Sequence, residues 1–431
     1  MKASVNKLRM LFTTLTLLST TIIAFAQQNR VLQNFRYPDQ RGINVFETPK
    51  EDTTEFNGIN VRLGGAFALQ YQAITHSNGI SGAEPTLIDL ANNFNLATAN
   101  MNIDVQLAQG VRMHLNTYLS SRHHREAWVK GGYLQIDNAD FIKKGFASSL
   151  MDIMTIKVGH MQNNYGDAHF RRSDNGMALY NPFVGNLIMD GFTTEVGGEA
   201  YFQKNGLVAV VGLTNGKLNQ SPKSPGSTKA AFIGKIGYDN QLSDDFRLRV
   251  TSSIYTIAKA SRIYLYSADR TGSRYYNVME AIAADGKDDF RSGRWNPSFA
   301  DKITAVMVNP FIKYKGLEFF GTYEVSTGGD AKGSTETRTW NQMAAEVLYR
   351  FGKAENLYLG TRYNTVSGKL AAADANEVSI DRLQVSAGWF LTKNILTKFE
   401  YVSQTYKDFD TTSKFNNGEF NGFMVEAVIS F

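Results

Sequence analysis

The sequence of 431 residues contains no cysteine, and this absence excludes several classes of site. Without thiols the chain forms no disulfide bond, offers no thiolate ligand to a metal and has no cysteine nucleophile. It also lacks the N-terminal cysteine that carries the lipid of a lipoprotein. We therefore expect neither a lipoprotein nor a cysteine-dependent enzyme.

Common catalytic signatures are missing as well, since the sequence has no G-x-S-x-G, no G-x-x-x-x-G-K-[ST] and no H-E-x-x-H. The histidines are scattered, apart from Arg122-His123-His124-Arg125 at a predicted loop tip. Adjacent histidines at a strand end point in opposite directions, which favours a solvated loop over a metal site. The acidic stretch from Asp285 to Asp289 has oxygen ligands that suit calcium, but it lacks the spacing of a known calcium loop. The sequence therefore predicts no enzyme, no cofactor and no metal site.

Long apolar runs are also absent, except at the N-terminus. There, Lys2, Lys7 and Arg9 precede an apolar run from Met10 to Ile23, which ends in the small-x-small sequence Ala24-Phe25-Ala26. This order predicts a secretory signal peptide over residues 1–26, and it favours cleavage over an N-terminal anchor helix.

Cleavage changes the charge balance, because the leader holds three basic residues and no acidic one. The net charge falls from +5 to +2, so the basic isoelectric point of the whole chain does not indicate a nucleic-acid partner. No later segment approaches the roughly 20 apolar residues of a membrane helix. A mature chain that spans a membrane must then do so as a β-barrel.

Alternation of polar and apolar residues is what the sequence does contain. In the stretch 100–107, Asn100, Asn102 and Asp104 alternate with apolar residues, as in a strand with one lipid face and one wet face. The same period predicts sixteen strands near 59–74, 94–108, 111–122, 125–137, 151–162, 190–203, 206–215, 229–238, 245–258, 303–314, 317–328, 337–351, 356–368, 378–391, 394–406 and 420–431. We therefore predict an all-β fold, a transmembrane antiparallel up-and-down β-barrel of about 16 strands over residues 59–431.

Short and long links alternate along these strands, as periplasmic turns and external loops do in outer-membrane barrels. Residues 138–150 break the rule as a long periplasmic turn, and Arg122 to Arg125 break it as a short external loop. An even strand count places both termini in the periplasm. Residues 27–58 precede the first strand, and the sequence leaves open whether they form a periplasmic segment or an insert in the lumen.

The last predicted strand alternates up to an aromatic residue, Phe431, at which the chain ends. A terminal phenylalanine on an apolar face resembles the signal that delivers barrels to their insertion machinery. Together with the leader it predicts an integral protein of the cell outer membrane, in contact with its lipid. The 28 phenylalanines and 20 tyrosines suit aromatic girdles at the two membrane interfaces.

Strand parity directs charges of both signs into the lumen. The predicted lining residues are Arg112, Asp104, Arg247, Arg249, Glu346, Arg362, Arg382, Lys398 and Glu400, and the same parity adds Arg350, Glu318, Glu324 and Glu426. Neighbouring charges of opposite sign neutralise one another across strands. Any ion selectivity is therefore expected to be weak.

By its strand count, the stretch Gly159 to Gly166, the segments Arg171-Arg172-Ser173 and Asn181-Pro182-Phe183, and Phe431, the chain resembles sixteen-stranded outer-membrane porins. It is similar in particular to the phosphate-selective porin O and P family. The resemblance implies a homotrimer that passes small anions through an arginine-lined constriction and a ladder of basic residues. Here acidic residues dilute that ladder, which argues against phosphate specificity.

In general porins the third external loop folds inward and narrows the pore. The resemblance therefore places residues 163–191 at a constriction, where a ring of arginine selects anions. The predicted constriction residues are Arg171, Arg172, Asp167, His169 and Asp174. The alternative is that both arginines are solvated on an outer loop.

The leading functional hypothesis is passive diffusion of small hydrophilic solutes, with a mild anion preference if Arg171 and Arg172 line the narrowest point. The second hypothesis is a barrel subunit with a structural or interaction role in a larger outer-membrane complex. Residues 27–58 and the long loop 257–302 are the segments that support it. An outer-membrane enzyme is the weakest reading, because no catalytic set is visible.

Overall fold

The computed structural model describes residues 32–48, 50, 54–80, 86–95, 97–121, 126–218, 226–267, 274–284, 289 and 292–431. The predicted leader, the histidine pair 123–124 and residues 285–288 of the acidic stretch lie outside this range. Within it, no helix is long and apolar enough to cross a membrane.

Sixteen long strands follow one another along the described chain. They are β1 (Asn60–Ser77), β3 (Thr98–Ala108), β4 (Val111–Ser120), β5 (Trp128–Ile136), β6 (Met154–Gln162), β7 (Thr194–Lys204), β8 (Leu207–Thr214), β9 (Ala231–Ser243), β10 (Phe246–Ile257), β11 (Ala300–Tyr314), β12 (Leu317–Gly329), β13 (Thr337–Phe351), β14 (Leu357–Gly368), β15 (Val378–Thr392), β16 (Ile395–Lys407) and β17 (Glu419–Ser430). The short elements are β2 (Asn93–Phe94), the 3-10 turns η1 (Gln40–Gly42) and η3 (Ala168–Phe170), and helix α2 (Ser148–Met151).

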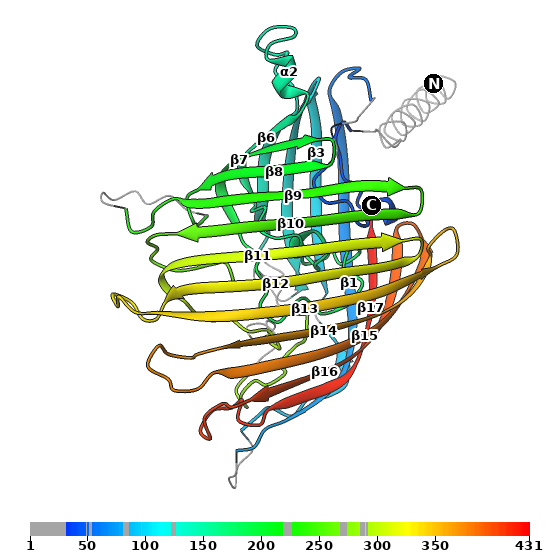
Figure 1. The fold of residues 1–431 in the computed structure, drawn as a ribbon. Helices are drawn as coiled ribbons and strands as arrows, with labels where there is room; N and C mark the ends of the chain where they lie inside the picture. The colour runs from blue at the N-terminus through cyan, green and yellow to red at the C-terminus, as the bar shows by residue number, and fades with distance from the viewer. Residues whose placement is uncertain are drawn as a thin grey trace, which may run out of the picture.

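These strands form one antiparallel sheet that β1 closes into a barrel. The first half of β1 pairs with β3, with Arg62 opposite Asp104, and its second half pairs with β17, with Gln70 opposite Glu426. Figure 1 shows β1 and β17 side by side at this seam. The two-residue β2 pairs only with a short part of β1. The predicted closed barrel of sixteen strands is therefore confirmed.

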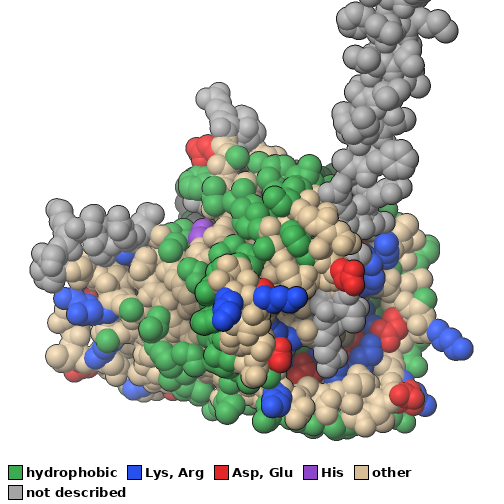
Figure 2. All heavy atoms as spheres, turned by 90° about the horizontal axis from the view of Figure 1, so that it is seen from above, with side chains coloured by type: hydrophobic (Ala, Val, Ile, Leu, Met, Phe, Trp, Pro, Cys, Tyr) green, Lys and Arg blue, Asp and Glu red, His purple; other side chains and the backbone are tan. Residues whose placement is uncertain are grey.

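Side chains alternate between lumen and exterior along each strand. In β13, Gln342, Glu346 and Arg350 are buried inside, whereas Met343 and Val347 are exposed on the outer wall. Figure 2 shows the molecule from above, with hydrophobic side chains over the outer surface. Acidic and basic side chains gather around a hollowed part of the face seen in this view. The alternation thus separates an apolar outer wall from a polar lumen.

Short turns gather at one end of the barrel, together with the C-terminus, and we call this end periplasmic. The turns are 109–110, 205–206, 244–245, 315–316, 352–356 and 393–394. One turn is tighter than predicted, because β9 continues to Ser243. There, Asn240 and Gln241 pair with β10 instead of forming a loop. The link 137–153 is longer than the other turns and contains α2.

The closing strand ends in a backbone clamp. The N–H of Phe431 donates to the carbonyl of Gly65 at 2.9 Å, and the N–H of Gly65 donates to the carbonyl of Phe431 at 3.0 Å. The aromatic side chain points outward and is 59% exposed. Its role as an insertion signal stays a prediction.

Described residues of three segments lie inside the barrel and fill much of its lumen. We call them the N-terminal segment (32–58), loop 3 (163–193) and the long loop (258–299). The N-terminal segment reaches the periplasmic rim, where the Gln40 N–H donates to the Lys393 carbonyl, and it reaches the wall, where Asn44 donates to Glu318. Loop 3 bonds to the wall through the N–H of Ile188, and the long loop packs its aromatic side chains into the largest apolar cluster.

Candidate functional site

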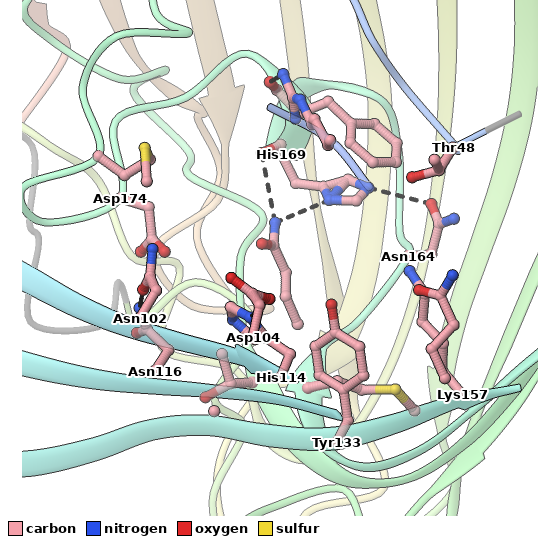
Figure 3. A pocket seen from close by; sticks show the side chains of 18 of the residues that line it. Thr48, Asn102, Asp104, His114, Asn116, Tyr133, Lys157, Asn164, His169 and Asp174 are labelled. Carbon is pink, nitrogen blue, oxygen red and sulfur yellow. Dashed lines mark hydrogen bonds and ion pairs between the residues drawn. The ribbon is translucent and has the colours of Figure 1, made fainter. Parts of the chain in front are cut away.

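Among the described residues, a polar cavity with a volume of about 270 Å³ lies in the lumen. Strands β3 to β7 form one side of it, and loop 3 and the N-terminal segment form the other. Figure 3 shows Asp104, His114, Tyr133 and Lys157 rising from these strands toward His169, which descends from loop 3. Amide, imidazole and charged groups therefore surround a single space.

The cavity extends along the barrel wall. On β3 it is lined by Asn100, Asn102 and Asp104, which are successive inward positions, and it continues to Arg112 and Gln135. Arg112 pairs with the next inward position of β3. At about 3.4 Å per residue, the inward positions 100 to 106 of β3 cover roughly 20 Å of the wall. The cavity thus follows most of the length of β3.

Asp104 is the centre of charge on the strand side. Its carboxylate lies 2.8 Å from His114 Nδ1, 3.3 Å from Arg112 Nη1 and 3.7 Å from Arg62 Nη1. The register brings these partners together, because Arg62 and His114 lie opposite Asp104 on the two neighbouring strands. The acid therefore lies between two arginines and an imidazole, and the arginines neutralise its negative charge locally.

Loop 3 presents a neutral imidazole to the cavity. Gln162 Nε2 donates to His169 Nδ1 at 2.8 Å, and His169 Nε2 donates to Asn164 Oδ1 at 3.1 Å, as the dashed lines in Figure 3 show. Burial, with the nearby charge of Lys235, holds the pKa of His169 well below its usual range. The ring therefore lines the cavity as a hydrogen-bonding group without charge.

Two cations of the cavity wall are held by aromatic rings, and no carboxylate of the described residues forms an ion pair with either. Lys157 Nζ lies 4.5 Å from the centre of the Tyr201 ring, and the guanidinium of Arg36 lies 3.7 Å over Tyr180. Arg36 also donates to two backbone carbonyls, one of them that of Phe170 at 2.9 Å. A ring fixes a cation without cancelling its charge. Both side chains therefore add positive potential to the cavity.

Among the predicted constriction residues, His169 and Asp174 line the cavity. Asp174 forms an ion pair of 2.5 Å with Lys130 and lies 3.5 Å from Arg172. The other three predicted residues lie in loop 3 but are packed away from the cavity.

Each of these three is tied to oppositely charged groups. Arg171 lies 3.4 Å from Glu346 and 3.7 Å from Glu318, and Arg172 bonds to Asp190. Asp167 is fully buried between Lys235 at 2.9 Å and Arg249 at 2.7 Å, and these cations outweigh its burial and hold its pKa below the usual value. Arg171 and Asp167 thus fasten loop 3 to the barrel wall, whereas Arg172 pairs with Asp190 inside the loop and stabilises its conformation.

All nine predicted lining residues point inward, but only Asp104 and Arg112 belong to the cavity. The rest lie beneath the inserted segments. Two of them contact loop 3 directly, Arg382 through the Asn186 carbonyl and Glu400 through the Val184 N–H. The others form ion pairs within the wall, which are Arg247 and Arg249 with Asp239, Glu346 with Arg362, and Lys398 with Glu426. Strand parity therefore gives the direction of these side chains, but not whether a loop covers them.

Sequence reasoning missed Lys157 and Arg36. Lys157 stands in the predicted strand 151–162, two positions after Thr155 and therefore on the same face of the strand. The alternation of this strand could thus have identified Lys157 as an inward residue. Arg36 lies in the N-terminal segment, which has no period, and no signal in the sequence places it.

No protein-family model matches the sequence, and no curated protein matches it. Solved structures match at the level of the fold. An anion-selective porin from Comamonas acidovorans has a TM-score of 0.52 at 10% identity, over 86% of this chain and 100% of that one. OmpT of Vibrio cholerae, in a trimer form, gives 0.51 at 9% identity over 87% and 100%. OmpF of Salmonella typhi, in complex with daunomycin, gives 0.50 at 12% identity over 87% and 98%. The chain therefore has a porin-like barrel fold.

Proposed function

We propose that the chain is an outer-membrane porin through which small hydrophilic solutes diffuse passively, with a mild preference for anions. The polar cavity along β3 to β7 carries the proposal. It offers hydrogen-bonding and charged groups along the wall of a closed barrel, and such a lining lowers the barrier for hydrated solutes. No catalytic group or cofactor takes part in this activity.

The charge balance of the cavity supports the anion preference. Each of its three carboxylates, Glu47, Asp104 and Asp174, contacts at least two cationic side chains. Among the described residues, neither Lys157 nor Arg36 forms an ion pair with a carboxylate, although Lys157 stands opposite the buried Glu199 on β7. An excess of one or two positive charges attracts anions into a narrow aqueous passage, but only weakly.

Loop 3 is the proposed constriction. In this account His169 and Asp174 line the narrow passage, Arg171 and Asp167 hold the loop against the wall, and Arg172 braces the loop internally through Asp190. The buried ion pairs of Arg171 and Asp167 with the wall support this role, because removal of one partner from such a pair is costly. The arginines then define the width of the passage more than its charge.

The proposed location and assembly follow from the fold and the leader. Residues 1–26 direct export and are removed, and Phe431 directs insertion into the outer membrane. The fold similarity to a trimeric form of OmpT supports a homotrimer. A native molecular mass of one protomer, in detergent that preserves the porin, would argue against that assembly.

Ion selectivity in a planar bilayer tests the proposal. Under a salt gradient, we expect the reversal potential of the wild-type protein to show a mild anion preference. The double variant R36Q/K157Q should lower the anion-to-cation permeability ratio by about two- to fivefold. The matched control K353Q changes an exposed lysine on a periplasmic turn and should leave the ratio unchanged. An equal effect of both variants would argue against this assignment of the passage.

One observation favours the second hypothesis, a barrel subunit of a larger complex. Three segments occupy the lumen, and aromatic side chains of the long loop such as Trp295, which lies 5.2 Å from Trp340, close much of it. A protein that carries no ion current and co-purifies with another polypeptide in stoichiometric amount would support this role instead.

A further inference from the structure

The turn 137–153 differs from every other described periplasmic turn. The other turns use two to five residues, whereas this one contains α2 and leaves residues 140 to 150 exposed without interruption. Four of the exposed side chains are large and apolar. Phe141 and Ile142 are each 59% exposed, Phe146 is 48% exposed and Leu150 is 47% exposed. Apolar groups gathered in this way at a surface mark a site of interaction.

The turn has a defined conformation of its own. The N–H of Ile142 donates to the Ala139 carbonyl, the N–H of Phe146 to the Lys143 carbonyl, and the N–H of Gly145 to Asp140 Oδ1 at 2.8 Å. Met151 and Ala139 are buried at the base and anchor the turn. The apolar side chains are therefore held away from the barrel and do not collapse onto it.

The position of the turn points to the membrane surface. In Figure 1, α2 stands beyond the ends of β6 and β7 and clear of the remaining turns. On the outer wall at the same rim, Leu107 of β3 and Leu207 of β8 are exposed, and Val158 of β6 is exposed above the turn. The apolar side chains of the turn thus project from the end of the barrel at which apolar residues of the outer wall are also exposed.

The lysines of the turn also fit a membrane surface. Lys143 and Lys144 are exposed and lie between Ile142 and Phe146 in the sequence. Asp140, the nearest acid before them, uses one oxygen to accept the Gly145 N–H. Basic side chains beside apolar ones are typical of segments that lie in a lipid interface, where the cations meet anionic phosphates.

We propose that this turn is an interfacial anchor that binds the phospholipid surface of the periplasmic leaflet. The side chains of Phe141, Ile142, Phe146 and Leu150 enter the headgroup region, and Lys143 and Lys144 bind lipid phosphates. The proposal depends on the membrane location proposed above, but not on conduction. A barrel that carries no current can still be anchored in this way.

The absence of cysteine allows a direct test with single-cysteine variants of the full-length protein. I142C would carry an environment-sensitive fluorophore on the turn, and K332C would carry the same fluorophore on an exposed loop at the opposite end. Both proteins are reconstituted in vesicles of phosphatidylethanolamine and phosphatidylglycerol. We expect lipid spin-labelled near the headgroup to quench the probe at 142 at least twofold more than the probe at 332. Both positions are exposed, so the labels should not disturb folding, and circular dichroism verifies the barrel.

A charge-reversed variant tests the lysines. K143E/K144E should reduce the lipid quenching at 142 in vesicles that contain phosphatidylglycerol, and it should have little effect in vesicles of phosphatidylcholine alone. An equal reduction of the lipid quenching in both kinds of vesicle would show that the lysines do not bind anionic lipid. Strong quenching of both probes by aqueous iodide, without lipid quenching, would overturn the anchor. Protection from iodide without lipid quenching would also overturn it, because a protein surface would then cover the turn.

Discussion

Two kinds of basic side chain occur in the lumen, and they differ in what neutralises them. Arg171, Arg172 and Arg249 lie against carboxylates, so their charges contribute to packing. Lys157 and Arg36 lie against aromatic rings, and their charges remain effective in the cavity. In the proposed channel, ion selectivity would therefore depend on which cations lack an ion pair with an acid, not on how many cations face inward.

This distinction predicts the sign of a change at Asp104. The variant D104N removes the carboxylate that Arg62, Arg112 and His114 share. We expect the anion-to-cation permeability ratio to rise about twofold, because the released cations act on the passage. The reversal potential under a salt gradient measures the change. D410N, at an exposed loop position, is the matched control, and a shift of D104N toward cations would contradict the account.

At the scale of elements, the buried acid Glu47 is one of the residues that hold the N-terminal segment in the lumen. Burial alone would raise the pKa of Glu47, but Arg249 and Lys235 outweigh burial and hold the pKa at about 2. Glu47 lies 2.7 Å from Arg249 and 3.1 Å from Lys235. Removal of such a buried partner costs about 3 kcal/mol, because two cations lose their counter-charge.

We therefore expect E47Q to loosen the N-terminal segment. Protease should cut the segment faster in the variant than in the wild-type protein, and the single-channel current should become larger or noisier. E55Q changes an exposed acid of the same segment and serves as the control. Protease resistance equal to that of the control would show that Glu47 does not hold the segment.

The same network predicts a dependence on acid. A carboxylate with a lowered pKa stabilises the folded state above its ordinary pKa, here 4.5, and loses that contribution as the pH falls toward 2. Asp167 forms ion pairs with the same two cations, Lys235 and Arg249, and its pKa is lowered as well. Its contribution to stability is therefore also lost as the pH falls. Protease protection of the segment should therefore be constant above about pH 5 and should decline toward about pH 3. In E47Q this decline should be smaller, and an equal decline would count against the assignment.

The strands were predictable because their period is a direct consequence of the two environments of the wall. The predicted strand 337–351 matches β13, and the others differ at their ends by a few residues. The inserted segments were not predictable, because lumen contacts such as Asn44 with Glu318 join residues far apart in sequence and follow no period. For the same reason, parity identified Asp104 and Arg112 as inward residues but did not separate them from Glu400, which loop 3 covers.

At the scale of the molecule, the closed seam between β1 and β17 makes Phe431 part of the barrel's outer surface. Its exposed ring contributes little packing, so F431S should reduce the amount of protein assembled in the outer membrane while leaving the thermal stability of the refolded barrel nearly unchanged. Heat-modifiable mobility in the membrane fraction measures assembly. F423S, at another outward aromatic position of β17, is the control. Equal loss with both variants would indicate a general effect of outer-wall aromatics.

The porin-like barrel fold, the segments inside its lumen and the polar cavity along β3 to β7 are the basis of the proposed narrow diffusion channel. The most direct test is the single-channel current of the purified full-length protein in a planar bilayer with symmetric salt. The account predicts discrete current steps, smaller than those expected for an unobstructed sixteen-stranded barrel, and proportional to voltage near zero. A protein that inserts into the bilayer but passes no current at any voltage or salt concentration would contradict it.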